Sequence, residues 1–528
     1  METMKCLTFL SLLFVCSALL SVANGKRRRR QQSNSMLLNY EKGKTSWETR
    51  GLNQIQRAAS RVPNQRLAKN IILFIGDGMG ISTVTAARIL GGQKLNMPGE
   101  ENMLKFEQFD DVALSKTYIL DRMTADSAAS ATALLCGVKT NYLVIGMDGE
   151  AVYKNCTETE RKSQKLDSVL EWAQAAGKRT GIVTTARITH ATPAAAYAKT
   201  PSRNWEGDSA MSKSDAPCKD IARQLVEDNK DINVLLGGGR QFFIPNYVID
   251  PEIKRVDGDQ RQDGRNLITE WIGDKAQRGV NHNYVWNRDQ FLAVDGNNTD
   301  FLLGLFDPSH MDYDMDRLEH GPYSEPSLSE MVGKAIDVLR KGKDGFFLLV
   351  EGAKIDHGHH ANRPEKALYD VLAMDKAVDV AISKTDFQDT LIMVTADHSH
   401  AFDIAGYPSR GSNILGLVKT PAGPVVAEDE MPYTILQYSN GPGYSLPRRN
   451  LFNIDMSNGA KQFPSGIPLS TETHGAEDVS VYARGPMSHL VQGVQEQTYF
   501  AYVMAYAACI GPYATGKNNK DCRSGHKL

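Results

Sequence analysis

Residues 71–78 read Ile71-Ile72-Leu73-Phe74-Ile75-Gly76-Asp77-Gly78, and this stretch decides the fold class. A short, continuous apolar run that ends at glycine suits a buried strand of a parallel sheet. Helical periodicity follows directly, from Ile81 to Leu90. The stretch therefore predicts a strand that leads into a helix.

The same order recurs along most of the chain. Further strands are expected at 112–116, 180–184, 233–236, 345–350, 390–395 and 479–483, and helices at 166–176, 218–229, 328–339, 364–382 and 495–508. This alternation predicts an α/β fold with a large, mostly parallel sheet and helices on both faces. Periodicity alone leaves two separate sheets open.

The segment from Gly406 to Ser470 has a different composition. It is rich in Gly, Pro, Ser and Tyr and lacks helical periodicity, so we expect a small β-rich insertion, like a crown on the core. The expected organisation has five parts. They are a signal peptide (1–25), a basic and polar segment with a helix near 53–60 (26–66), the α/β core (67–405), the crown-like insertion (406–470), and the end of the core with a tail (471–528).

The first residues carry a targeting pattern. Lys5 precedes an apolar run from Cys6 to Val22 that ends in Ala23-Asn24-Gly25, which predicts a secretory signal cleaved near this triplet. The run is shorter than the ~20 residues of a membrane span. The basic run 26–30 is either a processing site or a solvated tail. Residues 511–528 are largely polar, so no lipid-attachment signal is visible and we expect a soluble, secreted product without a membrane anchor.

The cysteines and sequons fit an extracellular protein. Two of the seven cysteines lie in the expected signal, which leaves Cys136, Cys156, Cys218, Cys509 and Cys522. An odd number in an oxidising compartment predicts two disulfides and one free thiol. Sequons at Asn155 and Asn297 are candidate glycosylation sites on the same route.

Overall charge is nearly balanced. Lys and Arg total 60 against 62 Asp and Glu, and the formal net charge is −2. A chain with this balance has no global attraction for nucleic acid or acidic membranes, so we expect no nucleic-acid partner. Any anion-binding site must be local.

Three acidic residues follow predicted strands closely: Asp77, Glu351 and Asp397. One such acid would be an ordinary turn or helix cap. Ligands of open α/β sheets bind beyond the carboxyl ends of the strands, and three unpaired carboxylates at one edge would repel each other unless cations neutralise them. The three acids therefore predict a cation site.

Histidines gather beside these acids. Six of the twelve fall in three short segments, as His357, His359, His360, His398, His400 and His474. A lone histidine is usually a core or surface group, whereas clusters next to carboxylates favour metal binding. Imidazole with carboxylate suits zinc, and all-oxygen sets suit magnesium. On a helix, Asp356 and His360 would share a face.

Ser127 is the candidate nucleophile. It follows a strand and opens an Ala-rich helix, where free backbone N–H groups and the helix dipole favour a bound phosphate. Without the metal cluster, Asp126 or Ser127 would simply be an N-cap. No Gly-x-Ser-x-Gly elbow surrounds Ser127, so activation by a metal is the natural alternative to a histidine base.

At these residues the chain resembles the animal alkaline phosphatases, in order and spacing, from about Lys69 to Cys522. The shared motifs are 77–80, 126–128, 189–193, 203–205, 351–360, 395–400 and 472–475. One departure surrounds Arg203, because Ser202 and Asn204 flank it where relatives commonly carry acids. The resemblance implies the fold predicted above and hydrolysis of phosphate monoesters.

The resemblance also implies the metal ligands, which are carboxylates, imidazoles and one hydroxyl. They are Asp356, His360 and His474 for one zinc, Asp77, Asp397 and His398 for a second zinc, and Asp77, Thr192 and Glu351 for magnesium, with His190 behind the magnesium site. Ser127 would form a phosphoserine, with one zinc lowering its pKa and the other stabilising the departing oxygen. Arg203 would bind two phosphate oxygens.

Three further expectations come from the resemblance. A calcium ion would bind Glu252, the Phe306 carbonyl, Asp307 and Glu325, although Asp307 and Glu325 each carry the other acid relative to common members. Disulfides would join Cys156 to Cys218 and Cys509 to Cys522, which leaves Cys136 free. The protein would be a homodimer, with segment 406–470 at an isologous two-fold interface.

Two other kinds of function compete with this interpretation. A related phosphodiesterase or sulfatase has a similar metal core, but no sulfatase modification motif surrounds Ser127, and Arg203 favours monoesters. A catalytically weak extracellular mineral-matrix or anion-binding protein would be marked by a lost ligand, and every ligand is present. Because many family members carry a lipid anchor, the cell surface is the alternative location.

Overall fold

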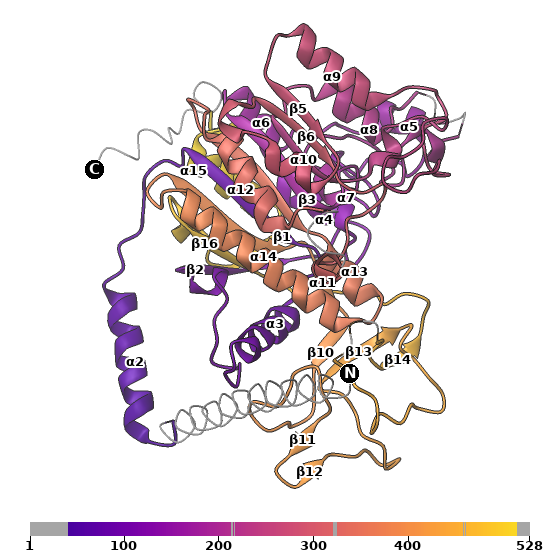
Figure 1. Cartoon of the computed structure of the whole chain (residues 1–528). Helices are drawn as coiled ribbons and strands as arrows, with labels where there is room; N and C mark the ends of the chain where they lie inside the picture. Colours follow the sequence, from indigo (N-terminus) through magenta and orange to yellow (C-terminus); the bar gives the residue numbers. More distant parts are fainter. Residues whose placement is uncertain are drawn as a thin grey trace, which may run out of the picture.

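The computed structural model describes residues 41–514 except 213, 214, 216, 320–324, 458 and 460. The expected signal segment, the basic run and Cys522 lie outside the described residues. A ten-stranded sheet forms the centre of the molecule, in the order β17-β2-β16-β8-β1-β7-β3-β4-β6-β5 (Figure 1). The strands are β1 Asn70–Gly76, β2 Asp111–Lys116, β3 Arg179–Arg187, β4 Val234–Gly238, β5 His282–Val285, β6 Phe301–Leu305, β7 Phe346–Gly352, β8 Thr390–Ala396, β16 Val479–Arg484 and β17 Gly493–Glu496.

The sheet is mostly parallel, as predicted, and it is one sheet. Among its ten strands only β16 runs against its neighbours, pairing antiparallel with β2 and β8. β1 lies between β7 and β8, and residues 71–75 are fully buried. The apolar run 71–75 therefore lies at the centre of the core.

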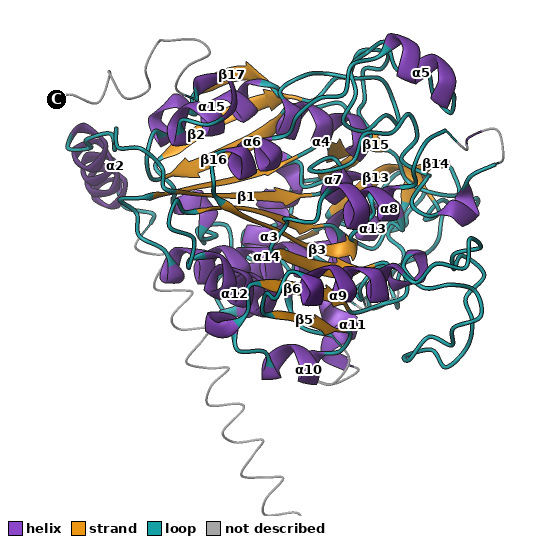
Figure 2. Cartoon of the chain, turned by 90° about the horizontal axis from the view of Figure 1, so that it is seen from above, coloured by secondary structure: helices purple, strands orange, loops and turns teal. Residues whose placement is uncertain are grey.

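Helices cover both faces of the sheet (Figure 2). One layer contains α3 (Ile81–Lys94), α12 (Leu328–Leu339) and α14 (Pro364–Lys384), and the other contains α4 (Ser127–Cys136), α6 (Val169–Ala175) and α15 (Tyr499–Ala508). Each layer packs its apolar side chains on the sheet, which gives two separate buried clusters. Strands buried on both faces must be apolar throughout, which explains runs such as 346–350.

Short strands make up the expected insertion. β10 (Phe402–Ile404), β13 (Leu436–Gly441) and β14 (Ser465–Pro468) form one small sheet, and β11 (Lys419–Thr420) pairs with β12 (Gly423–Pro424). No helix occurs among the described residues of 406–470. These small sheets lie beyond α13 (Lys354–His360), at the end of the molecule opposite α9 (Leu267–Gln277; Figure 1).

Some sequence predictions missed an element or its limits. The helix expected from Gln495 begins at Tyr499, because 493–496 form β17, a polar edge strand with no alternating pattern. The helix near 53–60 is longer, as α2 (Lys44–Ala59), and 218–229 contains only α8 (Ile221–Arg223) and a π-helical turn (Gln224–Asp228). β5 and β6 were not predicted.

Candidate metal centre and nucleophile

The ends of three neighbouring strands bring the three acids together. Glu351 lies in β7 opposite Ile75 of β1, and Asp77 and Asp397 follow β1 and β8, whose ends are also in register. Gly78 has a positive φ of 69°, and a Cβ there would meet the His400 ring. Glycine is therefore needed for this turn, and the Gly78 N–H donates to Asp397 Oδ1 at 3.1 Å.

A first group of donors comes from α13 and from β15 (His474–Gly475). Asp356 Oδ1 lies 3.3 Å from His360 Nε2 and 3.4 Å from His474 Nε2, and the two imidazole nitrogens are 3.2 Å apart. Asp356 and His360 share a helix face, as predicted. Two nitrogens and a carboxylate around one point form a donor set that fits zinc.

Asp77, Asp397 and His398 form a second group. His398 Nε2 lies 3.4 Å from Asp77 Oδ1 and 3.3 Å from Asp397 Oδ2, and all three side chains are buried. This group adjoins the first, since the His398 and His474 rings stack with centroids 3.6 Å apart. The structure thus brings the six residues expected at the two zinc sites to one place.

A third group contains Asp77, Glu351 and His190. Glu351 Oε1, His190 Nδ1 and the hydroxyl of Thr192 are buried without a partner of hydrogen-bond geometry among the described residues. Thr192 lies in α7 (Ala191–Ala194). Buried polar atoms without partners are costly, so their concentration here fits a cation site.

The acids of the second and third groups are destabilised as anions. Burial, followed by the charges of Asp397, Asp356 and Glu351, holds the pKa of Asp77 well above its usual range. Burial also raises the pKa of Asp397, and raises that of Glu351 to about 7. Bound cations would remove this cost by neutralising the cluster.

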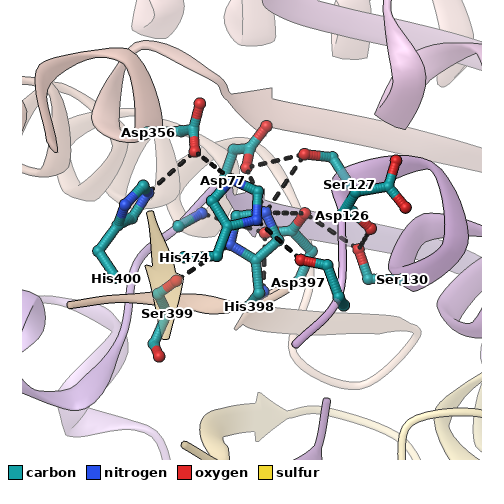
Figure 3. A network of polar contacts seen from close by, with 12 residues as sticks. Asp77, Asp126, Ser127, Ser130, Asp356, Asp397, His398, Ser399, His400 and His474 are labelled. Carbon is teal, nitrogen blue, oxygen red and sulfur yellow. Dashed lines mark hydrogen bonds and ion pairs between the residues drawn. The ribbon is translucent and has the colours of Figure 1, made fainter. Parts of the chain in front are cut away.

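Ser127 lies at the first turn of α4, against these groups (Figure 3). Its Oγ is 3.4 Å from Asp77 Oδ1 and 3.3 Å from His398 Nε2. Asp126 is the N-cap and accepts from the N–H groups of Ala128 and Ala129. The capping role does not compete with the nucleophile role, because the cap is Asp126 and the Ser127 hydroxyl points to the metal groups.

Arg203 lies beside the serine and is held from two sides. Its Nη1 donates to Asp126 Oδ2 at 3.0 Å, and its Nη2 donates to His190 Nε2 at 2.9 Å. Burial opposes the charge, but Asp126 outweighs burial and raises the pKa of Arg203. The contact with Asp126 was not anticipated, and nothing in the sequence pattern indicates it.

Two buried residues that the sequence analysis gave no role support the first group. His400, in β9 (Ser399–His400), approaches Asp356 Oδ1 with Nε2 at 2.9 Å, and its Nδ1 lies 2.5 Å from Glu472 Oε2. Burial lowers the pKa of His400, but the charges and hydrogen bonds of Glu472 and Asp356 together outweigh burial and raise the pKa to about 10. The signal was present, because His400 stands in a histidine cluster and Glu472 in the motif of His474.

His190, His310 and His357 form another histidine group. Arg187 already donates to His310, and Arg203 donates to His190. Two guanidinium groups thus face these imidazoles, and their charge disfavours a further cation. The acid-rich groups are the better metal sites.

The expected acidic calcium ligands lie close enough to interact electrostatically, but they do not form one of the tight donor groups found among the described residues. Glu325 Oε1 is buried and has no hydrogen-bond partner among the described residues, and burial followed by Asp312 and Asp307 raises the pKa of Glu325 well above its usual range. Burial raises the pKa of Asp307 to about 7. Glu252 instead accepts from Arg240 Nη2 at 2.7 Å.

The cysteines and sequons follow the sequence analysis where they are described. Cys156 and Cys218 form a disulfide, and Cys136 is free and buried in α4. The second expected bridge involves Cys522, which lies outside the described residues. Asn155 and Asn297 are exposed.

Comparisons with known proteins identify the family. The family model for alkaline phosphatase matches residues 68–510. The chain is 47% identical to alkaline phosphatase of Gadus morhua over 85% of this chain and 93% of that protein. It is 44% identical to the human tissue-nonspecific isozyme over 91% of each.

Solved structures share the fold. The alkaline phosphatase from the Antarctic bacterium TAB5 has a TM-score of 0.57 at 22% identity, covering 85% of this chain and 99% of that one. The Thermus thermophilus enzyme gives 0.59 at 22%, covering 84% and 92%. With a matching family model over most of its length and relatives this similar, the chain belongs to the alkaline phosphatase family of metal-dependent phosphomonoesterases.

Proposed function

We propose that this enzyme hydrolyses phosphate monoesters through a phosphoserine on Ser127. The observation that carries the proposal is the position of the Ser127 hydroxyl at the start of α4. Its Oγ lies within 3.4 Å of two candidate metal ligands, Asp77 after β1 and His398 after β8. The helix N-terminus and Arg203 favour a phosphate here. The alternative of a catalytically weak mineral-matrix or anion-binding protein predicts no turnover.

The donor sets support two zinc ions and one magnesium ion. Asp356, His360 and His474 would hold the first zinc, and Asp77, Asp397 and His398 the second, because both sets mix imidazole with carboxylate. Asp77, Glu351 and Thr192 offer oxygen only, which suits magnesium. His190 would support the magnesium site from behind.

Ser127 and Arg203 then have different roles in the reaction. When bound, the zinc ions supply positive charge that lowers the pKa of the Ser127 hydroxyl and stabilises the leaving oxygen. Ser127 gives its proton to solvent, and its Oγ forms a bond to phosphorus as the bond to the ester oxygen breaks and that oxygen takes a proton from water. Water then attacks phosphorus, the Ser127 Oγ–phosphorus bond breaks, and Ser127 regains a proton as inorganic phosphate is released. Arg203 binds two phosphate oxygens through both Nη atoms, oriented by Asp126 and His190.

Metal analysis combined with chelation tests this proposal. The enzyme should contain two zinc and one magnesium per chain, lose monoesterase activity on chelation, and recover it when both metals are returned. A diester measured in parallel should turn over far more slowly. Full activity after complete removal of metal would contradict the proposal, and a preference for the diester would favour a phosphodiesterase.

The calcium assignment is a separate proposal, with Glu252, the Phe306 carbonyl, Asp307 and Glu325 as ligands. The unpartnered Glu325 oxygen and the raised pKa of Asp307 support it. Calcium should raise the melting temperature of the native protein and leave that of Glu325→Gln unchanged. An equal rise in both would contradict the assignment.

We further propose a homodimer that uses segment 406–470 at its interface. The resemblance to the family supports this proposal, and the small sheets of 402–468 offer a separate surface for the contact. Light scattering at micromolar concentration should give twice the chain mass. A monomer mass would contradict it.

Secretion is the proposed location. The Cys156–Cys218 disulfide fits an oxidising compartment, and exposed Asn155 and Asn297 are accessible for glycosylation. No described helix is long and apolar enough to cross a membrane. The enzyme should accumulate in the medium of expressing cells. Recovery in the membrane fraction, with release by a lipid-anchor phospholipase, would place it at the cell surface instead.

A further inference from the structure

One buried carboxylate joins the two chain segments that meet at Arg203. We propose that Glu206 is a positioning residue for phosphate binding, which sets the place of the Arg203 guanidinium without touching the substrate. The inference rests on the proposed role of Arg203 as the phosphate-binding arginine.

Glu206 is 7% exposed and makes three side-chain contacts. Arg187 binds it through two parallel hydrogen bonds, from Nε to Oε2 at 2.8 Å and from Nη2 to Oε1 at 2.6 Å. The Thr189 hydroxyl donates to Oε2 at 2.7 Å. A bidentate arginine contact fixes orientation as well as distance, so the carboxylate is held rigidly.

The partners of Glu206 lie just before the residue that orients Arg203. Arg187 and Thr189 both precede His190 in sequence, Thr189 directly, and the His190 N–H donates to the Arg187 carbonyl at 2.9 Å. His190 Nε2 in turn accepts from Arg203 Nη2. The Glu206 contacts therefore hold the segment that carries His190.

Glu206 also belongs to the same loop as Arg203, three residues further along. Between them lies Trp205, which is 1% exposed, and both ends of this short connection are fixed by backbone bonds. The Arg203 N–H donates to the Leu143 carbonyl at 2.9 Å, and the Ala222 N–H donates to the Glu206 carbonyl at 3.1 Å. One carboxylate thus fixes the loop of Arg203 against the segment of its partner His190.

The contacts of Glu206 show what can support Arg203 although no acid stands directly beside it in sequence. Its neighbours Ser202 and Asn204 carry no charge, and Ser202 Oγ accepts from the Asn204 N–H within the loop. The next acid, Asp208, accepts from the N–H groups of Gln262 and Asp263 on another loop. Glu206 is therefore the acid of this loop that contacts the segment carrying His190, the partner of Arg203.

Inhibition by inorganic phosphate measures the effect. In the metal-loaded enzyme, Glu206→Gln keeps the side-chain shape but replaces the charge that binds Arg187. The inhibition constant of phosphate and the KM of a monoester should both rise about tenfold. The kcat should change by less than about threefold, and metal content should stay native. Thr189→Val loses one hydroxyl contact, and we expect a smaller rise of about threefold.

Asp208→Asn is the matched control, since it changes an acid of the same loop that points elsewhere. It should bind phosphate like the native enzyme, even where its melting temperature falls. Native phosphate inhibition in Glu206→Gln and Thr189→Val would overturn the inference. An equal rise in Asp208→Asn would also overturn it, since that result indicates general loosening of the loop. If the native enzyme does not turn over monoesters, the proposed function fails, whereas native phosphate inhibition in an active Glu206→Gln enzyme defeats this inference alone.

Discussion

Replacing Glu472 by Gln should weaken the proposed zinc site of Asp356, His360 and His474. The two carboxylate oxygens of Glu472 each face a different donor. Oε2 lies 2.5 Å from His400 Nδ1, and Oε1 accepts from the Ala401 N–H at 2.8 Å. A glutamine has only one oxygen, so one of these donors must face an NH₂ group. Because Glu472 is fully buried, water cannot repair the mismatch.

The size of the effect follows from these contacts. A buried donor left without an acceptor costs about 1–3 kcal/mol. A change in the position of the His400 ring directly disturbs Asp356, a ligand of the proposed zinc site, since His400 Nε2 is 2.9 Å from Asp356 Oδ1. Loss of an outer partner of a metal ligand typically reduces affinity by about 10–100-fold, which is consistent with that energy at about 1.4 kcal/mol per tenfold.

Competition with a coloured chelator measures zinc affinity in both proteins. Glu496→Gln is the control, because Glu496 is a partly exposed acid of β17 whose side chain binds Lys116 and Lys139 rather than a residue of the metal groups. The control should hold zinc like the native enzyme. Zinc affinity within twofold of native in Glu472→Gln would refute the reasoning.

Three further outcomes follow from other parts of the structure. Thr192→Val should lose magnesium and keep zinc by elemental analysis, because it removes a buried hydroxyl next to Glu351, and Thr192→Ser should restore magnesium; zinc loss in the valine variant would contradict the assignment. Removing the Cys156–Cys218 bridge, which spans 62 residues, should lower the free energy of unfolding by about 4 kcal/mol in denaturant titration, and no change would show that the bridge is not formed. Burial raises the pKa of Asp375 to about 6, so native stability falls as pH rises from about 4 through 6. Asp375→Asn should remove that fall and gain up to about 3 kcal/mol above pH 6, whereas parallel pH profiles would contradict the shift.

The sheet was predictable wherever a strand is buried on both faces. The runs 71–75 and 391–394 are apolar without interruption, and the structure confirms the strands predicted there. β17 was missed because its edge position leaves Val494 exposed among polar residues, so no pattern marks it. β6 was missed although 301–305 is an apolar run. Gly304 interrupts it, and a Cβ there would meet Phe306 and Leu236, so close packing requires the glycine.

The site was predictable in its residue types and less so in its supporting contacts. The acids after β1, β7 and β8 gather because strand ends of a parallel sheet share an edge, a consequence of topology. The contacts from Arg203 to Asp126 and from Glu206 to Arg187 join segments that are 77 and 19 residues apart. They depend on how loops fold over that edge, which no local periodicity encodes.

Chemical trapping on Ser127 tests the central claim most directly. The metal-loaded enzyme is mixed with a phosphate monoester, stopped in acid and digested, and its peptides are examined by mass spectrometry. We predict phosphate on the peptide that contains Ser127, and neither phosphate nor appreciable turnover in a Ser127→Ala variant that retains its metals. Phosphate on another residue, or near-native turnover in Ser127→Ala, would contradict the account.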